Sequence, residues 1–195
     1  MSEIKYKGYM IKIERDSDYP SPREDDNLGT MVCFHRRYDL GDKHDIKPGD
    51  FSGWEQMKDH IQKHFKTAVI LPLYLYDHSG ITMNTTGFSC PWDSGQVGWI
   101  YVTKEKVREE YGSCTKKNLA RAEEYLLGEV KMYDHYLTGD VWIYTIEDDR
   151  GEDTESCGGY YGEESALVDA KAAVDNMIKK HGEQLSLKLE EVKHE

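Results

Sequence analysis

The segment that most constrains the fold is the nearly continuous apolar run TAVILPLYLYD at residues 67–77. A short run of this kind, bounded by polar residues and rich in aliphatic and aromatic side chains, is typical of a buried β-strand. Apolar side chains on both faces favour a central strand that is covered on both sides. Pro72 lacks an N–H donor, however, and favours an edge position or a β-bulge. The sequence leaves these two interpretations open.

Other segments with strand character surround this run. Apolar and β-branched residues between turn-forming loops predict strands at 6–15, 30–38, 80–86, 96–102 and 140–147. Loops rich in Pro, Asp, Ser and Gly are predicted at 16–29 and 39–50. A further acidic loop is predicted at 147–159.

Apolar spacing and end signals predict helices at 52–65, 104–112, 115–137 and 163–180. Ser52 and Glu55 match the S-x-x-E capping box at the start of the first helix, and Thr103 is placed to cap the second. Gly139 and Gly182 predict the ends of the last two helices.

Strands with helices grouped after them predict an α+β protein, with one mixed or antiparallel sheet of about five strands packed by three to four helices. A chain of 195 residues is long enough to bury a core as one domain. We therefore expect a single domain over residues 1–195. The segment 183–195 is expected to be a flexible tail, either a frayed helix or an edge strand.

The charge of the chain limits its partners. The sequence has 37 acidic and 25 basic residues, a formal net charge of −12. Direct nucleic-acid binding requires basic surface to displace counterions, so we do not expect it. No apolar run approaches the roughly 20 residues of a membrane span, and the start MSEIKYKGYM does not resemble a signal peptide. A cytoplasmic protein without a membrane partner is expected.

The cysteines give no sign of a disulfide framework. Cys33, Cys90, Cys114 and Cys157 are scattered, and no two of them form a CxxC pair. Four isolated cysteines in a chain of this size predict reduced thiols in the core or on the surface.

The stretch YDHSG places Asp77, His78 and Ser79 side by side. Neighbouring residues of a strand point to opposite faces, so the three side chains cannot converge into a triad there. Asp, Ser and Gly favour a turn, which would join 67–77 to the strand at 80–86 as a hairpin. The competing interpretation is a small metal- or nucleotide-dependent enzyme centred on 77–93, built around Asp77, His78, Cys90 and Asp93.

Two other patterns have ordinary structural explanations. His60 and His64 lie four residues apart on a predicted helix, but no H-E-x-x-H pattern or third ligand accompanies them. The glycine-rich SCGGYYGEE at 156–164 lacks the pattern of a P-loop or a dinucleotide site, and its glutamates suit a helix start. We expect no metal, no cofactor and no catalytic residues.

Acidic residues concentrate between 147 and 155, where only Arg150 is basic. Their spacing does not match a calcium-binding loop, so the segment is either solvated or a surface for a basic groove. Nearby tyrosines would add contact area, and Trp92 in a predicted irregular loop, 85–96, would anchor either the core or an interface. The predicted partner-binding residues are Asp148, Asp149, Glu152, Asp153, Glu155, Tyr160, Tyr161 and Trp92.

Arg36 and Arg37 lie in an acidic chain, near the carboxylates of residues 24–26. We expect at least one of the two arginines to pair internally with a carboxylate, because an arginine fork bonded in this way would order the loop before it.

Three blocks of the sequence resemble a known family: SPREDDNLGTMVCFHRRYDLGD at 21–42, the segment from LPLYLYDHSG to VREEYG at 71–112, and VKMYDHYLTGDVWIY at 130–144. The family consists of small acidic proteins of bacteriophages, prophages and gut bacteria. The resemblance implies a non-enzymatic protein that binds and inhibits a host defence protein, as anti-CRISPR proteins do. An RNA-guided nuclease, with its positively charged channel, is the leading target. A phage accessory protein with a regulatory partner is the alternative, and the oligomeric state stays open.

Overall fold

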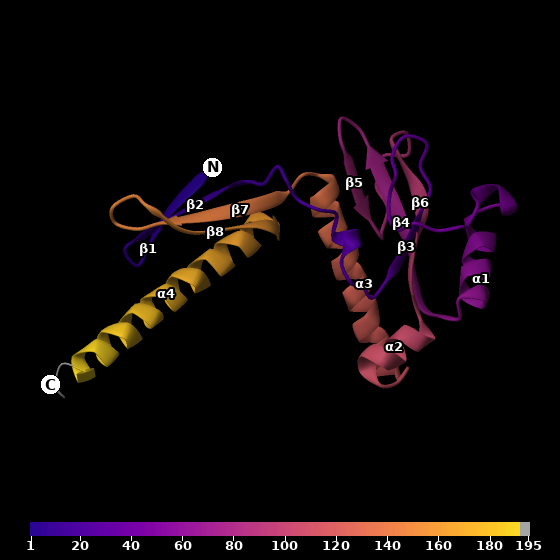
Figure 1. Ribbon diagram of the computed structural model, residues 1–195. Helices are drawn as coiled ribbons and strands as arrows, with labels where there is room; N and C mark the ends of the chain where they lie inside the picture. Colours follow the sequence, from indigo (N-terminus) through magenta and orange to yellow (C-terminus); the bar gives the residue numbers. More distant parts are fainter. Residues whose placement is uncertain (192–195) are drawn as a thin grey trace. The chain divides into compact units, whose positions relative to one another are not determined.

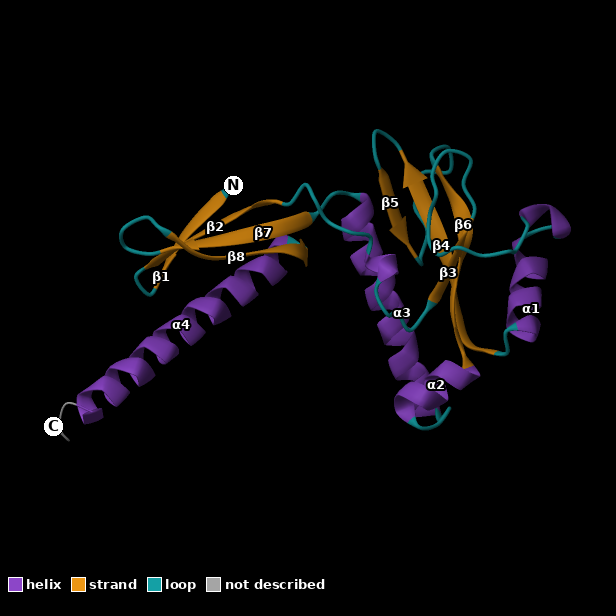
Figure 2. Ribbon diagram, in the orientation of Figure 1, coloured by secondary structure: helices purple, strands orange, loops and turns teal. Residues whose placement is uncertain are grey.

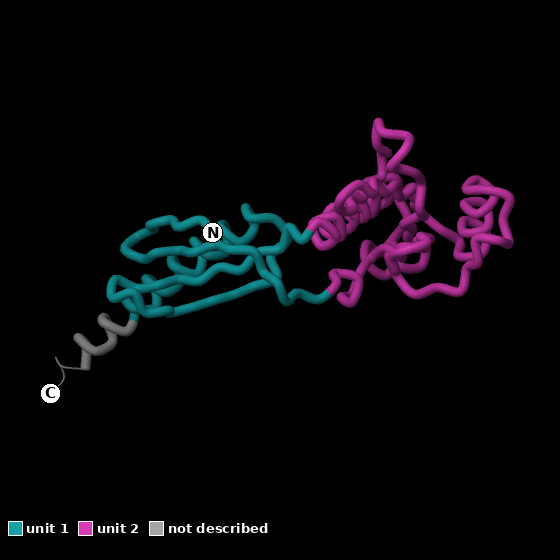
Figure 3. Tube along the Cα trace, turned by 90° about the horizontal axis from the view of Figure 1, so that it is seen from above, with its two compact units in different colours: residues 1–20, 139–195 teal, residues 21–138 magenta. Residues whose placement is uncertain are grey.

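The computed structural model describes the backbone of residues 1–191, which contain four α-helices and eight strands (Figures 1 and 2). The predicted α+β class is confirmed, and of the two predicted kinds of sheet, mixed or antiparallel, the described strands form the antiparallel kind. The strands form two four-stranded sheets, however, where the sequence predicted one sheet of about five strands. Residues 1–20 with 139–195 make one compact unit and residues 21–138 a second (Figure 3). None of the helices described is long and apolar enough to cross a membrane.

The first unit is a sheet covered on one face by a helix. Its strands are β1 (Ser2–Tyr6), β2 (Tyr9–Arg15), β7 (Val141–Glu147) and β8 (Asp153–Tyr161), in the order β1-β2-β7-β8. Helix α4 (Glu163–Glu191) lies along one face of this sheet (Figure 1). Small side chains on the helix allow close packing, and the buried residues of this core are Ile11, Ile13, Tyr144, Ile146, Ala166, Ala170 and Val174.

Three sequence predictions for this unit are corrected. The strand predicted at 6–15 is part of a hairpin, because Lys7 and Gly8 take φ values of 48° and 92° and turn the chain between β1 and β2. Most of the predicted acidic loop 147–159 belongs to β8, an edge strand whose exposed polar residues give no apolar alternation. Gly182 lies inside α4, so the segment predicted as a tail is helical to Glu191. Residues 192–195 lie outside the described chain.

The second unit is a sheet with a helix on each face. Its strands β3 (Thr30–Cys33), β6 (Ser94–Thr103), β4 (Thr67–Asp77) and β5 (Ile81–Asn84) follow the order β3-β6-β4-β5. Helix α3 (Lys116–Leu137), preceded by α2 (Lys104–Tyr111), covers one face, and α1 (Trp54–His64) covers the other (Figure 1). Short 3-10 turns occur at Pro22–Glu24 and Pro48–Asp50. The two cores confirm that the run 67–77 is covered on both sides.

Pro72 lacks an N–H donor, yet it lies in β4, a strand with a neighbour on each side. Strand β4 lies between β6 and β5, but β5 pairs only with residues 74–77 of β4. At Pro72, therefore, the described chain supplies a neighbouring strand on the β6 side alone. Proline is tolerated at such an edge.

Local capping signals define most helix ends. Thr103 and Thr115 accept backbone N–H groups at the starts of α2 and α3, and Gly139 has a φ of 66° just after α3. The predicted capping box of α1 is wrong. The helix begins one residue later than the box requires, with Gly53 as N-cap, so Gln56 instead of Glu55 reaches back to the N–H of Ser52, at 2.6 Å.

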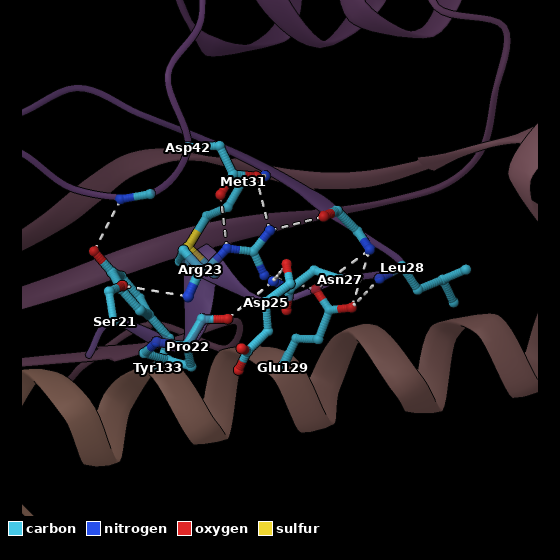
Figure 4. Close-up of polar contacts among 12 residues, drawn as sticks. Ser21, Pro22, Arg23, Asp25, Asn27, Leu28, Met31, Asp42, Glu129 and Tyr133 are labelled. Atoms are coloured by element: carbon cyan, nitrogen blue, oxygen red, sulfur yellow. Dashed lines mark hydrogen bonds and ion pairs between the residues drawn. The ribbon is translucent and has the colours of Figure 1, made fainter. Parts of the chain in front are cut away.

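A buried network of charges ties the segment 21–42 to α3 (Figure 4). The guanidinium of Arg23 donates to both carboxylate oxygens of Asp42, at 2.8 and 2.7 Å, and to Oε2 of Glu129, at 2.8 Å. It also donates to the carbonyl of Gly29 at 2.7 Å. Burial lowers the pKa of Arg23, but the hydrogen bonds to Asp42 and Glu129 outweigh it, so that the pKa is raised. The side chains of Arg23 and Glu129 are 5% and 6% exposed.

The same carboxylates hold the backbone of the segment. Glu129 accepts the N–H groups of Leu28 and Gly29, at 2.7 and 3.0 Å, and Asp42 accepts that of Met31 at 2.7 Å. The backbone comes so close to α3 that a Cβ on Gly29 would lie 2.4 Å from Leu126 Cδ2. Every charge in the network is therefore hydrogen-bonded, which buried charges require.

Replacement of Glu129 tests this network. We expect Glu129→Ala to lower the free energy of unfolding by about 3–5 kcal/mol, because it leaves Arg23 buried without one of its two carboxylates. Urea unfolding followed by circular dichroism measures the change. The matched control is Glu123→Ala, an exposed glutamate of the same helix, which should change the free energy by no more than about 0.5 kcal/mol. Equal losses in the two variants would contradict the assigned role.

Candidate functional site

The predicted partner-binding residues fall in both units. Trp92 belongs to the unit 21–138, and the other seven belong to the β7–β8 hairpin of the unit formed by both chain ends. They therefore form two surfaces, one in each unit: a cleft beside Trp92 and an acidic hairpin.

The cleft lies where β3 and β4 end and β6 begins, and it has a volume of about 1100 Å³. Its polar wall comes from residues 35–37, which follow β3, from Asp77 at the end of β4, and from Asp93 just before β6. Its apolar lining includes Phe34, Trp54, Leu75, Trp92 and Val97. A hydrogen bond of 2.7 Å from the N–H of Phe34 to the carbonyl of Val97 ties the segment that follows β3 to β6.

Asp77, at the end of β4, forms an ion pair with a side chain from the segment that follows β3. The Arg37 guanidinium donates to Asp77 Oδ2, and this hydrogen bond raises the pKa of Arg37. The ring of His35 stacks on Tyr38 with centroids 4.9 Å apart, and His35 Nε2 lies 3.7 Å from the same Asp77 oxygen. The predicted internal pairing is thus confirmed for Arg37. Its partner is Asp77, however, and the loop at 24–26 is not involved.

Asp93 contacts Cys90 and His78, two other residues of the alternative enzyme site predicted at 77–93. Cys90 Sγ donates to Asp93 Oδ2 at 3.7 Å, and His78 Nδ1 lies 3.3 Å from the same oxygen. The carboxylate thus contacts both the thiol and the imidazole, an arrangement unlike the direct thiol–imidazole contact of a cysteine nucleophile. Residues 77–80 form the predicted turn between β4 and β5, with Ser79 at a φ of 56° and the His78 N–H bonded to the Gly80 carbonyl at 3.0 Å.

Trp92 stands out because it is 90% exposed. The loop that carries it extends over 85–93, since β6 begins at Ser94, slightly earlier than predicted. Asn84 Oδ1 accepts the N–H groups of Thr86 and Gly87 at 3.1 and 2.7 Å, and Ser94 Oγ donates to the Cys90 carbonyl at the other end. The loop is therefore ordered by its own polar residues, as predicted. The option that Trp92 anchors the core is wrong, which leaves the interface option.

The acidic hairpin contains carboxylates with structural roles. Asp148 accepts the N–H groups of Glu152 and Arg150, at 3.0 and 2.8 Å, and these hydrogen bonds lower its pKa. Glu147 pairs with Lys12, and Glu155 accepts the hydroxyl of Tyr144 at 3.2 Å.

Among the other residues of this surface, the tyrosines pack against the protein and three carboxylates are exposed. Tyr160 and Tyr161, which were predicted to contact a partner, are partly buried. Tyr160 packs against Tyr144 with ring centroids 5.5 Å apart, and the Tyr161 hydroxyl donates to the Pro20 carbonyl at 3.2 Å. Asp149, Glu152 and Asp153 are exposed, and their carboxylates have no ion pair with any described residue. These three carboxylates are the part of the acidic surface without a hydrogen bond or ion pair to a described residue, although Glu147 and, more weakly, Asp153 raise the pKa of Lys12.

A metal ion requires several ligating side chains gathered at one place. Within the described chain, no three His, Cys, Asp or Glu side chains are placed to hold a metal ion. His60 and His64 stack on each other, with ring centroids 5.3 Å apart, on an exposed part of α1. All four cysteines are free, and burial raises the pKa of Cys33 to about 12.

Two features of these sites were not predicted from the sequence. Arg23 had no predicted role, although it holds the segment that leads into the cleft. Arg36 and Arg37 were predicted together, but Arg36 lines the cleft without a bonded partner among residues 1–183, whose side chains the structure describes. Adjacent arginines give no local signal of which one will find a carboxylate.

No protein-family model, curated protein or solved structure matches the chain. The resemblance to phage and prophage proteins therefore stays a prediction, and the function has to be argued from the geometry of the two surfaces.

The turn at Asp148 gives a pH-dependent prediction. Because hydrogen bonds lower the pKa of folded Asp148, its contribution to stability is present above its unfolded pKa and is lost as the pH falls through its folded pKa. We expect Asp148→Ala to lower the melting temperature at neutral pH, and the difference from the unmodified protein to shrink in acid. Asp149→Ala, which removes an exposed carboxylate of the same turn, should leave the melting temperature unchanged at each pH. A difference for Asp148→Ala that persists undiminished in acid would contradict this role.

Proposed function

We propose that this is a non-enzymatic binding protein, and that the unit 21–138 docks on a partner protein through Trp92 and the cleft beside it. The observation that carries the proposal is the 90% exposure of Trp92 on a hydrogen-bonded loop. Tryptophan is enriched among the residues that dominate binding energy at interfaces. A loop that is already ordered loses little conformational entropy when its partner binds.

The contacts of the polar groups in and beside the cleft favour a partner-binding function over the alternative of an enzyme centred on 77–93. Asp77 is taken by Arg37, and Asp93 lies between Cys90 and His78. An activated cysteine contacts its general base directly, whereas Cys90 and His78 each contact Asp93, and no hydrogen bond joins the two among the described residues. They act as supports that position the walls of the cleft.

The partner class comes from the resemblance and from charge. A phage protein that inhibits a host defence protein would meet a basic surface in the nucleic-acid channel of an RNA-guided nuclease. The net charge of −12 would speed such an encounter at low ionic strength. A regulatory phage partner is the alternative target for the same binding protein.

The acidic hairpin is a second candidate surface for a basic partner. The specific observation in its favour is that Asp149, Glu152 and Asp153 are exposed on the hairpin without an internal ion pair among the described residues. Asp148 keeps the turn in shape, so these carboxylates are presented by an ordered element.

Replacement of Trp92 tests the main proposal. The partner is captured from a host lysate, identified and purified, and its affinity is then measured by titration calorimetry. We expect Trp92→Ala to weaken binding about 30-fold, the loss typical of an interface hot spot. The melting temperature should not change, because the side chain is exposed.

The matched control is Tyr125→Ala, which removes an aromatic side chain that is 53% exposed on α3. Tyr125 does not line the cleft, so its loss should leave the affinity unchanged. If Trp92→Ala binds the purified partner as tightly as the unmodified protein, the proposed function of the cleft is wrong.

Charge reversal tests the hairpin. We expect the triple change of Asp149, Glu152 and Asp153 to lysine to slow association with a basic partner, most strongly at low salt. Asp148 is left in place because its loss would disturb the turn. The melting temperature reports on the fold.

The control is the same triple reversal at Glu109, Glu123 and Glu124, exposed residues of α2 and α3. It changes the net charge equally but at another surface. An equal effect of the two triple changes would show that total charge, and not the hairpin, governs association.

A further inference from the structure

The charged groups that line the cleft are not equally free. The lining contains two arginines and two aspartates. Arg37 pairs with Asp77, and Asp93 is held by His78 and Cys90. Arg36 is exposed and has no hydrogen bond, ion pair or ring contact to any described residue. Among these four groups, Arg36 is therefore the one that is free to bind a ligand.

The chemistry of this free group defines what it can recognise. A guanidinium carries five N–H donors in a planar fork that matches a carboxylate. The two carboxylates that line the cleft, Asp77 and Asp93, are already bonded to other side chains. A carboxylate brought in by a partner would be free to pair with Arg36 without displacing those bonds.

The rest of the cleft adds apolar surface and space. Phe34, Trp54 and Trp92 contribute aromatic surface around the cleft that Arg36 also lines. A Cβ added at Gly95 would meet no described atom within 4 Å, so there is room for a ligand close to the backbone of β6. The surface thus combines one free cation with a large apolar area.

We infer that the cleft binds a segment of the partner protein in which an aspartate or glutamate stands next to a large apolar side chain. Arg36 pairs with the carboxylate, and Trp92 with the neighbouring aromatic groups covers the apolar side chain. This inference rests on the proposed function, and it names the chemistry that the proposed site selects.

Three peptides that differ at one position test the inference. The probes are acetyl-Gly-X-Leu-Phe-Gly-amide, with glutamate, glutamine or lysine at X, and binding is followed by chemical-shift changes in NMR titrations at low salt. We expect the glutamate peptide to bind about twofold to fivefold more tightly than the glutamine peptide, a gain within the range of exposed ion pairs. The lysine peptide should bind most weakly.

Charge reversal at Arg36 sharpens the test. Arg36→Glu should reverse the order, so that the lysine peptide binds most tightly. Lys131→Glu makes the same change in net charge at an exposed position of α3, and the original order should persist. A reversal in both variants would assign the preference to net charge and overturn the role of Arg36.

Two glycine variants test the location. Gly95→Leu fills the open space beside β6 and should abolish binding of all three peptides. The control is Gly128→Leu on α3, where an added Cβ likewise meets no described atom within 4 Å, and binding should persist.

The outcomes separate this inference from the proposed function. Equal affinities for the three peptides, or no binding of any of them, overturn the selection of a carboxylate by Arg36. The proposed function is judged independently, by the effect of Trp92→Ala on the purified natural partner. If that variant loses affinity for the partner while the three peptides bind equally, the cleft is a docking site but Arg36 does not select a carboxylate.

Discussion

The buried guanidinium of Arg23 is the interaction on which the geometry of the 21–138 unit depends. It joins Asp42 and Glu129, and the two carboxylates in turn hold the backbone of residues 28–31. Burying charges is costly unless each one is bonded, so loss of one member leaves the others in an unfavourable environment. The network defines where β3 lies against α3. The residues that follow β3, including Arg36, form a wall of the cleft.

In both the cleft and the hairpin, some charged residues bond to neighbouring residues of the protein and others do not. Arg37, Asp77 and Asp93 bond to neighbours in the cleft, and Asp148 closes the hairpin turn. Such groups shape the surface but have little capacity left for a partner. The groups that make no hydrogen bond or ion pair with a described residue are Arg36 in the cleft, and Asp149, Glu152 and Asp153 on the hairpin.

The internal bonds of these carboxylates mean that the number of acidic residues overstates the negative charge available to a partner. The excess of acidic residues suggests a large negative surface, yet several of the carboxylates in the acidic segment serve the fold. The cleft offers a cation and aromatic surface, whereas the hairpin offers carboxylates, so the two surfaces suit partner groups of opposite charge. A partner can therefore be recognised by local chemistry that differs from the net charge of the chain.

Local signals in the sequence determined the elements whose geometry depends on nearby residues. Thr103 and Gly139 mark helix ends, the apolar run 67–77 forms a strand, and residues 77–80 form a turn, because capping, periodicity and turn preferences act over a few residues. The tertiary structure alone decided that β2 pairs with β7 and that Arg23 meets Glu129, 106 residues away. It also decided that Arg37, and not Arg36, reaches Asp77 and that Trp92 stays exposed. These outcomes depend on contacts between distant segments, which periodicity and composition do not record.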